Sequence, residues 1–328
     1  MLKSLYVIDS HSVDPRHNIA LEEYLLRHVK PGECIFYLWQ NQRTVVIGRN
    51  QHASNECRIQ ALEADGGHLV RRLSGGGAVY HDLGNLNFTF LTVRNDYDVE
   101  KQTDTILQAV RSLGIPAEKT GRNDLTADGG KFSGHAYYRA GEQCYHHGTL
   151  MVSVDLAPLE KYLNVSPLKL QAKGVKSVRS RVVNLRELCP GLTIEKMVET
   201  MNRAFEQVYG LTAVPLQEQD FDHDALDTLY AQFSSRDWVY GRSAPLDFAC
   251  GDKFPWGEVS LHLRVEHGSC RDAAVYTDAM DAELSAVVEG ALNGCAFSAE
   301  TLCRAIEGAA VAEEIKDDLC RLIRAQNI

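Results

Sequence analysis

The chain has 328 residues, of which 45% are hydrophobic and 24% charged, and its formal net charge is −10. This length and composition are typical of a globular protein with about two domains. No apolar run reaches the roughly 18 residues of a membrane span, and the acidic balance gives no basic face for nucleic acid. The nine cysteines contain no Cys-x-x-Cys pair, which argues against a disulfide framework or a zinc site. We therefore expect a cytoplasmic protein without a nucleic-acid or membrane partner.

Hydrophobic spacing in the first third of the chain predicts a mixture of strands and helices. The first nine residues read as an opening strand, because charge enters too early for a signal peptide. Apolar residues at helical spacing predict helices over 18–29 and 101–113. Aliphatic and aromatic runs predict strands over 34–39, 44–47, 67–73 and 85–93.

A glycine-rich loop follows the strand over 67–73. It contains Gly75, Gly76 and Gly77 and is preceded by Arg71 and Arg72. Glycine has no Cβ, so its N–H group can approach an anion closely. An arginine can clamp a carboxylate or a phosphate with its planar fork of donors. The alternative is a tight hairpin turn with two solvated arginines, and the remaining motifs decide against it.

Strands predicted over 132–139 and 143–154 form a hairpin that turns at 140–142. Lys131 stands at the mouth of the first strand, and the run 146–150 (His-His-Gly-Thr-Leu) lies on the second. Antiparallel pairing therefore places the lysine and this run on one sheet. Each feature also has a structural explanation, namely a solvated lysine and a satisfied core histidine.

Two further polar segments accompany the hairpin. Asn123 and Asp124 lie in the segment 121–125, which reads as a polar turn. The segment 173–181 is basic, contains glycine and has few apolar residues. A mobile basic loop of this kind can fold over a bound phosphate. Alone, either segment could be ordinary surface.

The pattern changes after Pro245. Helices are predicted over 194–209 and 225–234 before this point. After it come strands over 256–265 and 270–276, then three helical stretches that end with 311–324. A strand hairpin followed by helices suggests a small separate α+β domain.

Together these residues meet the needs of a site that activates a carboxylic acid with ATP. The acid carboxylate must attack the α-phosphate, and negative charge grows there as pyrophosphate leaves. Such a site needs fixed positive charge, backbone donors and a divalent metal, with little acid–base chemistry. Lys131, the two arginines, the glycine loop and the Asn123–Asp124 pair supply these groups.

The same motifs resemble those of the lipoate–protein ligases, in the biotin/lipoate ligase superfamily. The resemblance runs through five ordered segments, which are 71–85, 121–125, 131–136, 146–150 and 173–181. It implies an α+β fold with a large mixed-sheet catalytic domain of the biotin/lipoate ligase type over 1–243. The part over 246–328 resembles the small C-terminal α+β accessory domain of the two-domain ligases.

The resemblance implies a reaction in two steps. Lipoate and ATP, with Mg²⁺, give lipoyl-AMP and pyrophosphate. A lysine of an acceptor protein then takes the lipoyl group, and AMP is released. The implied acceptors are the apo lipoyl domains of 2-oxoacid dehydrogenase E2 subunits and the glycine-cleavage H protein.

Site residues are also implied by position. Lys131 would be catalytic, contacting the lipoyl carbonyl and the α-phosphate, and Asp124 would hold the metal. The implied lipoate- and ATP-binding residues are Arg71, Arg72, Ser74, Gly75, Gly76, Gly77, Ala78, Val79, Tyr80, Asn85, Asn123, Asp124, His147, Gly148, Thr149, Lys173, Gly174, Val175, Ser177 and Val178. Residues 50–52 and 137–138 depart from the family pattern, which bears on the preferred chain length of the acid.

Two other functions fit the sequence less well. An acyltransferase of the same fold would use a nucleophilic cysteine, and Cys144, close to the His-His run, is the residue to consider. A non-enzymatic lipoate-binding regulator would be expected to lack the lysine or the glycine loop. Both are present, which favours nucleotide activation.

Overall fold

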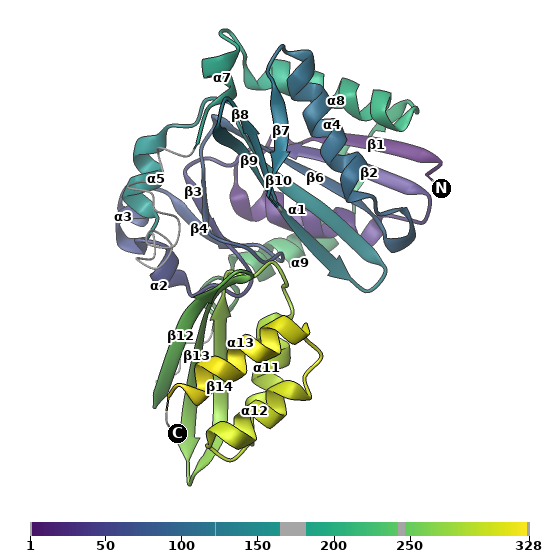
Figure 1. Ribbon diagram of the computed structural model, residues 1–328. Coiled ribbons are helices and arrows are strands. Elements are labelled where there is room, and N and C mark those ends of the chain that lie inside the picture. The colour runs from purple at the N-terminus through teal and green to yellow at the C-terminus, as the bar shows by residue number, and fades with distance from the viewer. Residues whose placement is uncertain (1, 122, 165–181, 242–246, 327–328) are drawn as a thin grey trace.

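The computed structural model describes residues 2–121, 123–164, 182–241 and 247–326. The described part contains three sheets. One has eight strands in the order β11-β1-β2-β6-β10-β9-β8-β7, and the other two have three strands each, β4-β3-β5 and β12-β13-β14. Figure 1 shows the first two sheets in one large body and the third in a smaller unit below it. The predicted α+β architecture, with a large mixed sheet and a small C-terminal unit, is confirmed.

The eight-stranded sheet is mixed. β1 pairs in parallel with β2 and β11, and the remaining neighbours pair antiparallel. Its strands are β1 Ser4–Asp9, β2 Glu33–Trp39, β6 Asn85–Val93, β7 Ala117–Thr120, β8 Asp124–Ala127, β9 Gly130–Ala140, β10 Gln143–Met151 and β11 Ala213–Pro215. The hairpin predicted to turn at 140–142 is therefore present, with Gln143 opposite Ala140.

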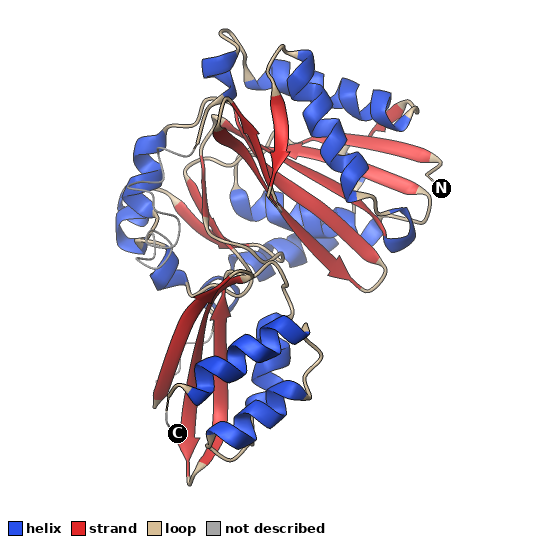
Figure 2. Cartoon of the chain, in the orientation of Figure 1, coloured by secondary structure: helices blue, strands red, loops and turns tan. Residues whose placement is uncertain are grey.

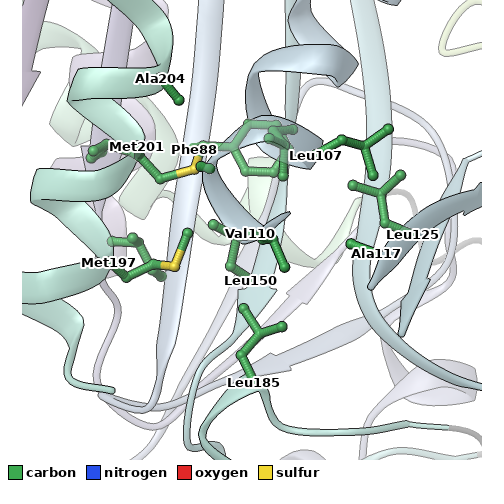
Figure 3. Close-up of a cluster of buried hydrophobic side chains, with 14 of the residues drawn as sticks. Phe88, Leu107, Val110, Ala117, Leu125, Leu150, Leu185, Met197, Met201 and Ala204 are labelled. Atoms are coloured by element: carbon green, nitrogen blue, oxygen red, sulfur yellow. The ribbon is translucent and has the colours of Figure 1, made fainter. Parts of the chain in front are cut away.

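Helices cover both faces of this sheet (Figure 2). On one face lie α1 (Pro15–His28) and, packed against it, α9 (His223–Ser234). The Asp14 carboxylate caps α1 by accepting from the Arg16 N–H, and Pro15 occupies the first turn. On the other face lie α4 (Val99–Ser112) and α8 (Ile194–Tyr209). The core beneath them, drawn in Figure 3, includes Phe88, Leu107, Val110, Leu150, Met197 and Met201.

The small sheet of the large body carries the glycine loop. Its strands are β3 Thr44–Ile47, β4 His68–Arg71 and β5 Val79–His81. Residues 40–43 link the two predicted strands over 34–39 and 44–47, which lie in different sheets as β2 and β3. Four short helices pack against this sheet, namely α2 Ala53–Glu56, α3 Ile59–Ala64, α5 Leu156–Tyr162 and α10 Arg236–Tyr240. A fifth short helix, α7 Leu185–Leu188, packs instead in the core of the large sheet. Two 3₁₀ turns lie at η1 Arg94–Asp96 and η3 Glu218–Asp220.

The C-terminal unit has its own hydrophobic core. Strands β12 (Phe248–Phe254), β13 (Gly257–Glu266) and β14 (Ser269–Thr277) are covered on one face by three helices. These are α11 Leu284–Leu292, α12 Ala299–Glu307 and α13 Glu313–Arg324. β12 was not predicted, because its sequence mixes glycine and charged residues with few apolar ones. Among the described residues, no helix combines the length and apolar character that crossing a membrane requires.

Candidate functional site

The β9 strand places Lys131 beside Asp124. β8 pairs with β9 through a register shift next to Lys131, and the lysine Nζ lies 2.7 Å from Asp124 Oδ1. Each side chain is about one-third exposed, at 35% and 34%, so the ion pair lies at the edge of solvent. The segment 121–125, expected as a turn, instead continues at Asp124 into β8, where Asp124 and Leu125 pair antiparallel with Gly134 and Ser133 of β9.

Lys131 also lies on the same sheet as the histidine run, as predicted. His147 is opposite Ala136 and Gly148 is opposite His135 in the β9–β10 register. Thr149 Oγ1 accepts from the Gly134 N–H at 3.4 Å. A Cβ at Gly134 would lie 2.9 Å from the Lys131 Nζ, so the lysine side chain runs over this glycine. The strand pairing therefore gathers the lysine, Thr149 and His147 in one place.

The Arg71 side chain is hydrogen-bonded to main-chain carbonyls. Its guanidinium donates to five carbonyl oxygens at 2.7–3.2 Å, and the side chain is only 6% exposed. These oxygens belong to Gly48, Arg49, Gln51, Trp238 and Val239. Burial lowers the pKa of the guanidinium to about 10. In this conformation Arg71 joins the glycine-loop sheet to α10 rather than offering donors to an anion.

Arg72 holds the glycine loop from within. Its Nη2 donates to the carbonyls of Gly75 (2.7 Å) and Gly77 (2.8 Å), and its Nε donates to Ser74 Oγ (3.0 Å). Its Nη1 donates to the Val46 carbonyl at 3.2 Å. Desolvation lowers the pKa of this buried guanidinium to about 10. The predicted anion-binding role of both arginines stays a prediction, because in this conformation the donors of Arg71 hold other main-chain carbonyls and those of Arg72 hold the glycine loop.

A buried polar chain leads from Ser74 to α1. His147 Nε2 lies 2.8 Å from Ser74 Oγ, and His147 Nδ1 lies 2.8 Å from Glu22 Oε1. The same carboxylate oxygen accepts from Thr89 Oγ1 at 2.7 Å, which in turn accepts from the Trp39 indole N–H at 3.1 Å. Glu22, Thr89 and Trp39 were not predicted as site residues from the sequence. The available signal was a carboxylate, Glu22, within the apolar stripe of the predicted helix.

Loop residues of the C-terminal unit cover the glycine loop. The Gly76 N–H donates to the Ala279 carbonyl at 2.9 Å. The Met280 sulfur lies 3.1 Å from where a Cβ at Gly76 would be, and 3.9 Å from Asn123 Nδ2. Gly76 has φ +91°, a conformation that favours glycine. One methionine side chain thus spans the gap between the glycine loop and Asn123, so these two predicted site elements face each other.

A cavity of about 450 Å³ adjoins this point. It is lined by Tyr97, Val99, Tyr137, Tyr138, Arg139, Met280, Asp281, Ala282 and Glu283. The Tyr138 ring lies 5.3 Å from that of Tyr145, which lies 4.6 Å from that of His147. The Tyr145 ring therefore packs between Tyr138 of the cavity wall and His147 of the buried polar chain. Its size and its mixture of apolar and charged lining residues suit a small molecule with an apolar body and a polar group.

The other predicted residues divide into three groups. Asn85 Nδ2 donates to Asn87 Oδ1 at 2.8 Å in a buried position on β6. Ala78, Val79 and Tyr80 enter or form β5, where Tyr80 packs into a small core. Lys173, Gly174, Val175, Ser177 and Val178 lie outside the described residues. The described chain on either side is attached at Asn164, which donates to the Glu56 carbonyl, and at Val183, which donates to the Lys131 carbonyl.

Cys144 is poorly placed for nucleophilic catalysis. It is fully buried on β10, and burial raises the pKa of its thiol. Because side chains alternate along a strand, Cys144 shares the face of His146 and not that of His147. A cysteine nucleophile needs access and thiolate character, so the geometry favours the lysine-based site.

The family comparison agrees with this geometry. Residues 14–206 match the family model of the lipoyl protein ligase A/B catalytic domain, and residues 245–323 match that of the bacterial lipoate protein ligase C-terminus. The first match alone covers more than half of the chain.

Solved structures show the same likeness. LipL1 of P. falciparum, solved in complex with lipoate, is 27% identical with a TM-score of 0.85, covering 98% of this chain and 99% of that one. The bi-partite lipoate protein ligase of Thermoplasma acidophilum, studied with its E2 lipoyl domain, is 26% identical with a TM-score of 0.64, covering 75% and 100%. A lipoate-protein ligase A bound with ATP shares the fold at 24% identity and a TM-score of 0.64, over 74% and 99%. The chain belongs to the lipoate–protein ligase family and is a ligase.

Proposed function

We propose that this chain activates lipoate with ATP and then transfers the lipoyl group to a lysine of an acceptor protein. The observation that carries the proposal is the meeting of two predicted elements at Met280, which contacts both the glycine loop at Gly76 and the amide of Asn123. Lys131 is ion-paired with Asp124, the residue that follows Asn123, with its Nζ 2.7 Å from Asp124 Oδ1. Cationic, amide and backbone donors therefore converge on one place.

In the first step, a carboxylate oxygen of lipoate attacks the α-phosphorus, and the bond from that phosphorus to the pyrophosphate oxygen breaks. Negative charge increases on the α-phosphate and on the leaving group. Lys131 would stabilise this charge once its Nζ exchanges the Asp124 carboxylate for the phosphate. In the second step, the acceptor amine attacks the lipoyl carbonyl, the bond to AMP breaks, and the amine gives up a proton.

The residues present suit Mg²⁺ bound together with a substrate. Mg²⁺ is commonly held by one or two carboxylates, with substrate phosphates and water completing its shell. Asp124 supplies one carboxylate beside Lys131, and no cluster of three or more ligating side chains exists among the described residues. Asp124 would hold the ion, which supplies charge neutralisation at the phosphates when bound.

We assign the acyl chain of lipoate to the cavity lined by Tyr137 and Tyr138. Two observations support this choice. The cavity reaches Met280, next to the glycine loop, and three tyrosines, a valine and a methionine give its wall a mainly apolar surface. These tyrosines are also where the sequence departs from the family pattern, so we expect them to set the preference between lipoate and octanoate.

The acceptor and the cellular setting follow from the family. We propose apo lipoyl domains of 2-oxoacid dehydrogenase E2 subunits, or the glycine-cleavage H protein, as acceptors, and an E2 lipoyl domain is the partner of the Thermoplasma ligase. All nine cysteines are free, which supports a reducing, cytoplasmic location. We propose domains over 1–243 and 246–328, with a boundary that lies outside the described residues.

The test is lipoate-dependent exchange of labelled pyrophosphate into ATP by the purified chain, with Mg²⁺ and no acceptor. We expect exchange that requires lipoate, followed by lipoylation when an apo lipoyl domain is added. Lipoylation from an acyl carrier without ATP, and no exchange, would contradict the proposal and favour a transferase.

A further inference from the structure

The polar chain from Trp39 to Arg72 forms one continuous hydrogen-bonded line. It passes through Thr89, Glu22, His147 and Ser74, with donor–acceptor distances of 2.7–3.1 Å. Its members come from β2, β6, α1, β10 and the glycine loop, and each is at most 6% exposed. In a buried line of this kind, nearly every N–H or O–H group must have an acceptor, because an unpaired buried donor or acceptor destabilises the fold.

The polarity of the line is fixed by three of its members. An indole N–H and a guanidinium N–H can only donate, and a carboxylate can only accept. Thr89 receives the Trp39 hydrogen, so its own hydroxyl hydrogen goes to Glu22. Glu22 also faces His147 Nδ1 at 2.8 Å, so this nitrogen carries the imidazole hydrogen.

The remaining two hydrogens follow from that assignment. In a neutral imidazole that carries its hydrogen on Nδ1, Nε2 is an acceptor. Ser74 Oγ has two acceptors within reach, this nitrogen at 2.8 Å and the Gly75 carbonyl at 3.5 Å, and the shorter distance assigns its hydroxyl hydrogen to His147. The Ser74 oxygen in turn accepts a hydrogen bond from the Nε–H of Arg72. Arg72 in turn holds the carbonyls of Gly75 and Gly77. An unbroken line of hydrogen bonds therefore connects the Glu22 carboxylate in α1 to the backbone of the glycine loop.

We propose that Glu22 is a positioning residue of the ligase. It selects the Nδ1–H form of His147, which orients Ser74 and Arg72 and holds the glycine loop ready for the nucleotide. The kinetic part of this inference rests on the proposed function, whereas the tautomer of His147 does not.

An alternative role for the same three residues is catalysis with Ser74 as the nucleophile. The order Glu22–His147–Ser74 matches the contacts of a hydrolase triad. However, Ser74 is fully buried and its oxygen already accepts from Arg72. A covalent nucleophile needs a free approach to its oxygen, so the geometry points to positioning.

The test compares two substitutions of similar size. Glu22→Gln keeps an acceptor oxygen and removes the charge, whereas Glu22→Met fills the volume and removes the acceptor. We expect Glu22→Met to raise the KM for ATP in pyrophosphate exchange about thirtyfold, because it leaves buried donors unmatched, and Glu22→Gln to stay within about fivefold of the parent. Glu23→Gln and Glu23→Met are matched controls one position along α1, where the carboxylate pairs with Arg27.

The direct readout is the His147 tautomer, measured by long-range ¹H–¹⁵N NMR on histidine-labelled protein and assigned with His147→Gln. We expect Nδ1–H in the parent chain and in Glu22→Gln, and loss of that form in Glu22→Met. A parent chain with Nε2–H, or equal kinetics in the two folded Glu22 variants, would overturn the proposal. Covalent labelling of Ser74 by a fluorophosphonate would also overturn it, and would show that Ser74 is a nucleophile. If the parent shows the Nδ1–H form but no exchange, the proposed function fails and the tautomer assignment stands.

If Glu22→Met does not fold, the parent tautomer and the Glu22→Gln variant still decide the question. Glu22→Gln that keeps Nδ1–H should keep its KM for ATP, and a large KM increase with that tautomer intact would contradict the role assigned to Glu22.

Discussion

His146 and His147 are neighbours in sequence and lie on opposite faces of β10. His147 joins Ser74 to Glu22 and so reaches the glycine loop. His146 contacts His135 at 2.9 Å and Gln102 at 3.1 Å, among the aromatic side chains of the α4–α8 face. Burial lowers the pKa of His146 well below its usual value and that of His135 to about 3.

The difference shows what makes a buried histidine part of a site. Both residues sit in hydrogen-bonded lines, but the line through His146 ends at Gln102 and at Ser133, which is 1% exposed. The line through His147 ends at Arg72, which holds the loop predicted to bind the nucleotide. We therefore expect changes on the His147 face to alter catalysis, and changes on the His146 face to alter stability.

Among the predicted site residues, the largest effect on catalysis is expected at Lys131. Lys131→Ala should reduce pyrophosphate exchange by about a thousandfold, since loss of one well-placed electrostatic donor costs about 10²–10³ in rate. The melting temperature should change little, because the Lys131–Asp124 pair is partly exposed. Lys119→Ala removes another ion-paired lysine, on β7, and should leave exchange near the parent rate. A Lys131→Ala chain that exchanges pyrophosphate normally would refute the assigned role.

The next effect concerns the dependence of stability on pH. His81 and His135, each with pKa lowered to about 3 by burial, and His146 stay neutral in the folded chain. The unfolded chain takes up protons below its histidine pKa of about 6.5, so the free energy of unfolding should fall as pH drops below that value. His81 and His135 each contribute up to about 1.4 kcal/mol per pH unit down to about pH 3, and His146 acts in the same direction. Urea denaturation at pH 7.5, 6.5 and 5.5 measures this, and a flat profile would contradict it.

A substitution on the core face should separate stability from catalysis. His146→Leu leaves His135 Nδ1 without its partner, so the free energy of unfolding should fall by about 2 kcal/mol. The kcat of pyrophosphate exchange should remain within about twofold, since His146 makes no hydrogen bond to the residues that hold the glycine loop and meets the proposed acyl cavity only through ring packing with Tyr137 at 4.9 Å. His223→Gln changes an exposed histidine at the start of α9 and serves as the stability control. A large loss of kcat in folded His146→Leu would break the distinction between the faces.

Sequence reasoning located the pairing on which this comparison depends. The hairpin turn near Gly141 set the register, and the register alone places Lys131 and His147 on one sheet. Glu22 was missed because its partners lie 67 and 125 residues away, so no local pattern reveals them. The arginine donors were unpredictable for the same reason, since Arg71 is held by α10 and by residues 48–51.

Short strands were the other limit of prediction. β8 has only four residues and is defined by its partner β9 rather than by its own sequence. The contact of Met280 with Gly76 joins the two units of the chain, and neither segment carries a signal of the other. Packing between distant segments, rather than local preference, decided these features.

The smallest expected effect lies at that contact. Met280→Ala removes the sulfur from the space between Gly76 and Asn123, two of the residues predicted to bind the nucleotide. Because the methionine must leave before the nucleotide binds, its removal should lower the KM for ATP about threefold, equivalent to roughly 0.7 kcal/mol. Met201→Ala would be a poor control because it opens a cavity in the core, whereas Leu83→Ala changes an exposed apolar side chain. A raised KM for ATP in Met280→Ala would mean that the methionine supports the nucleotide site instead of blocking it.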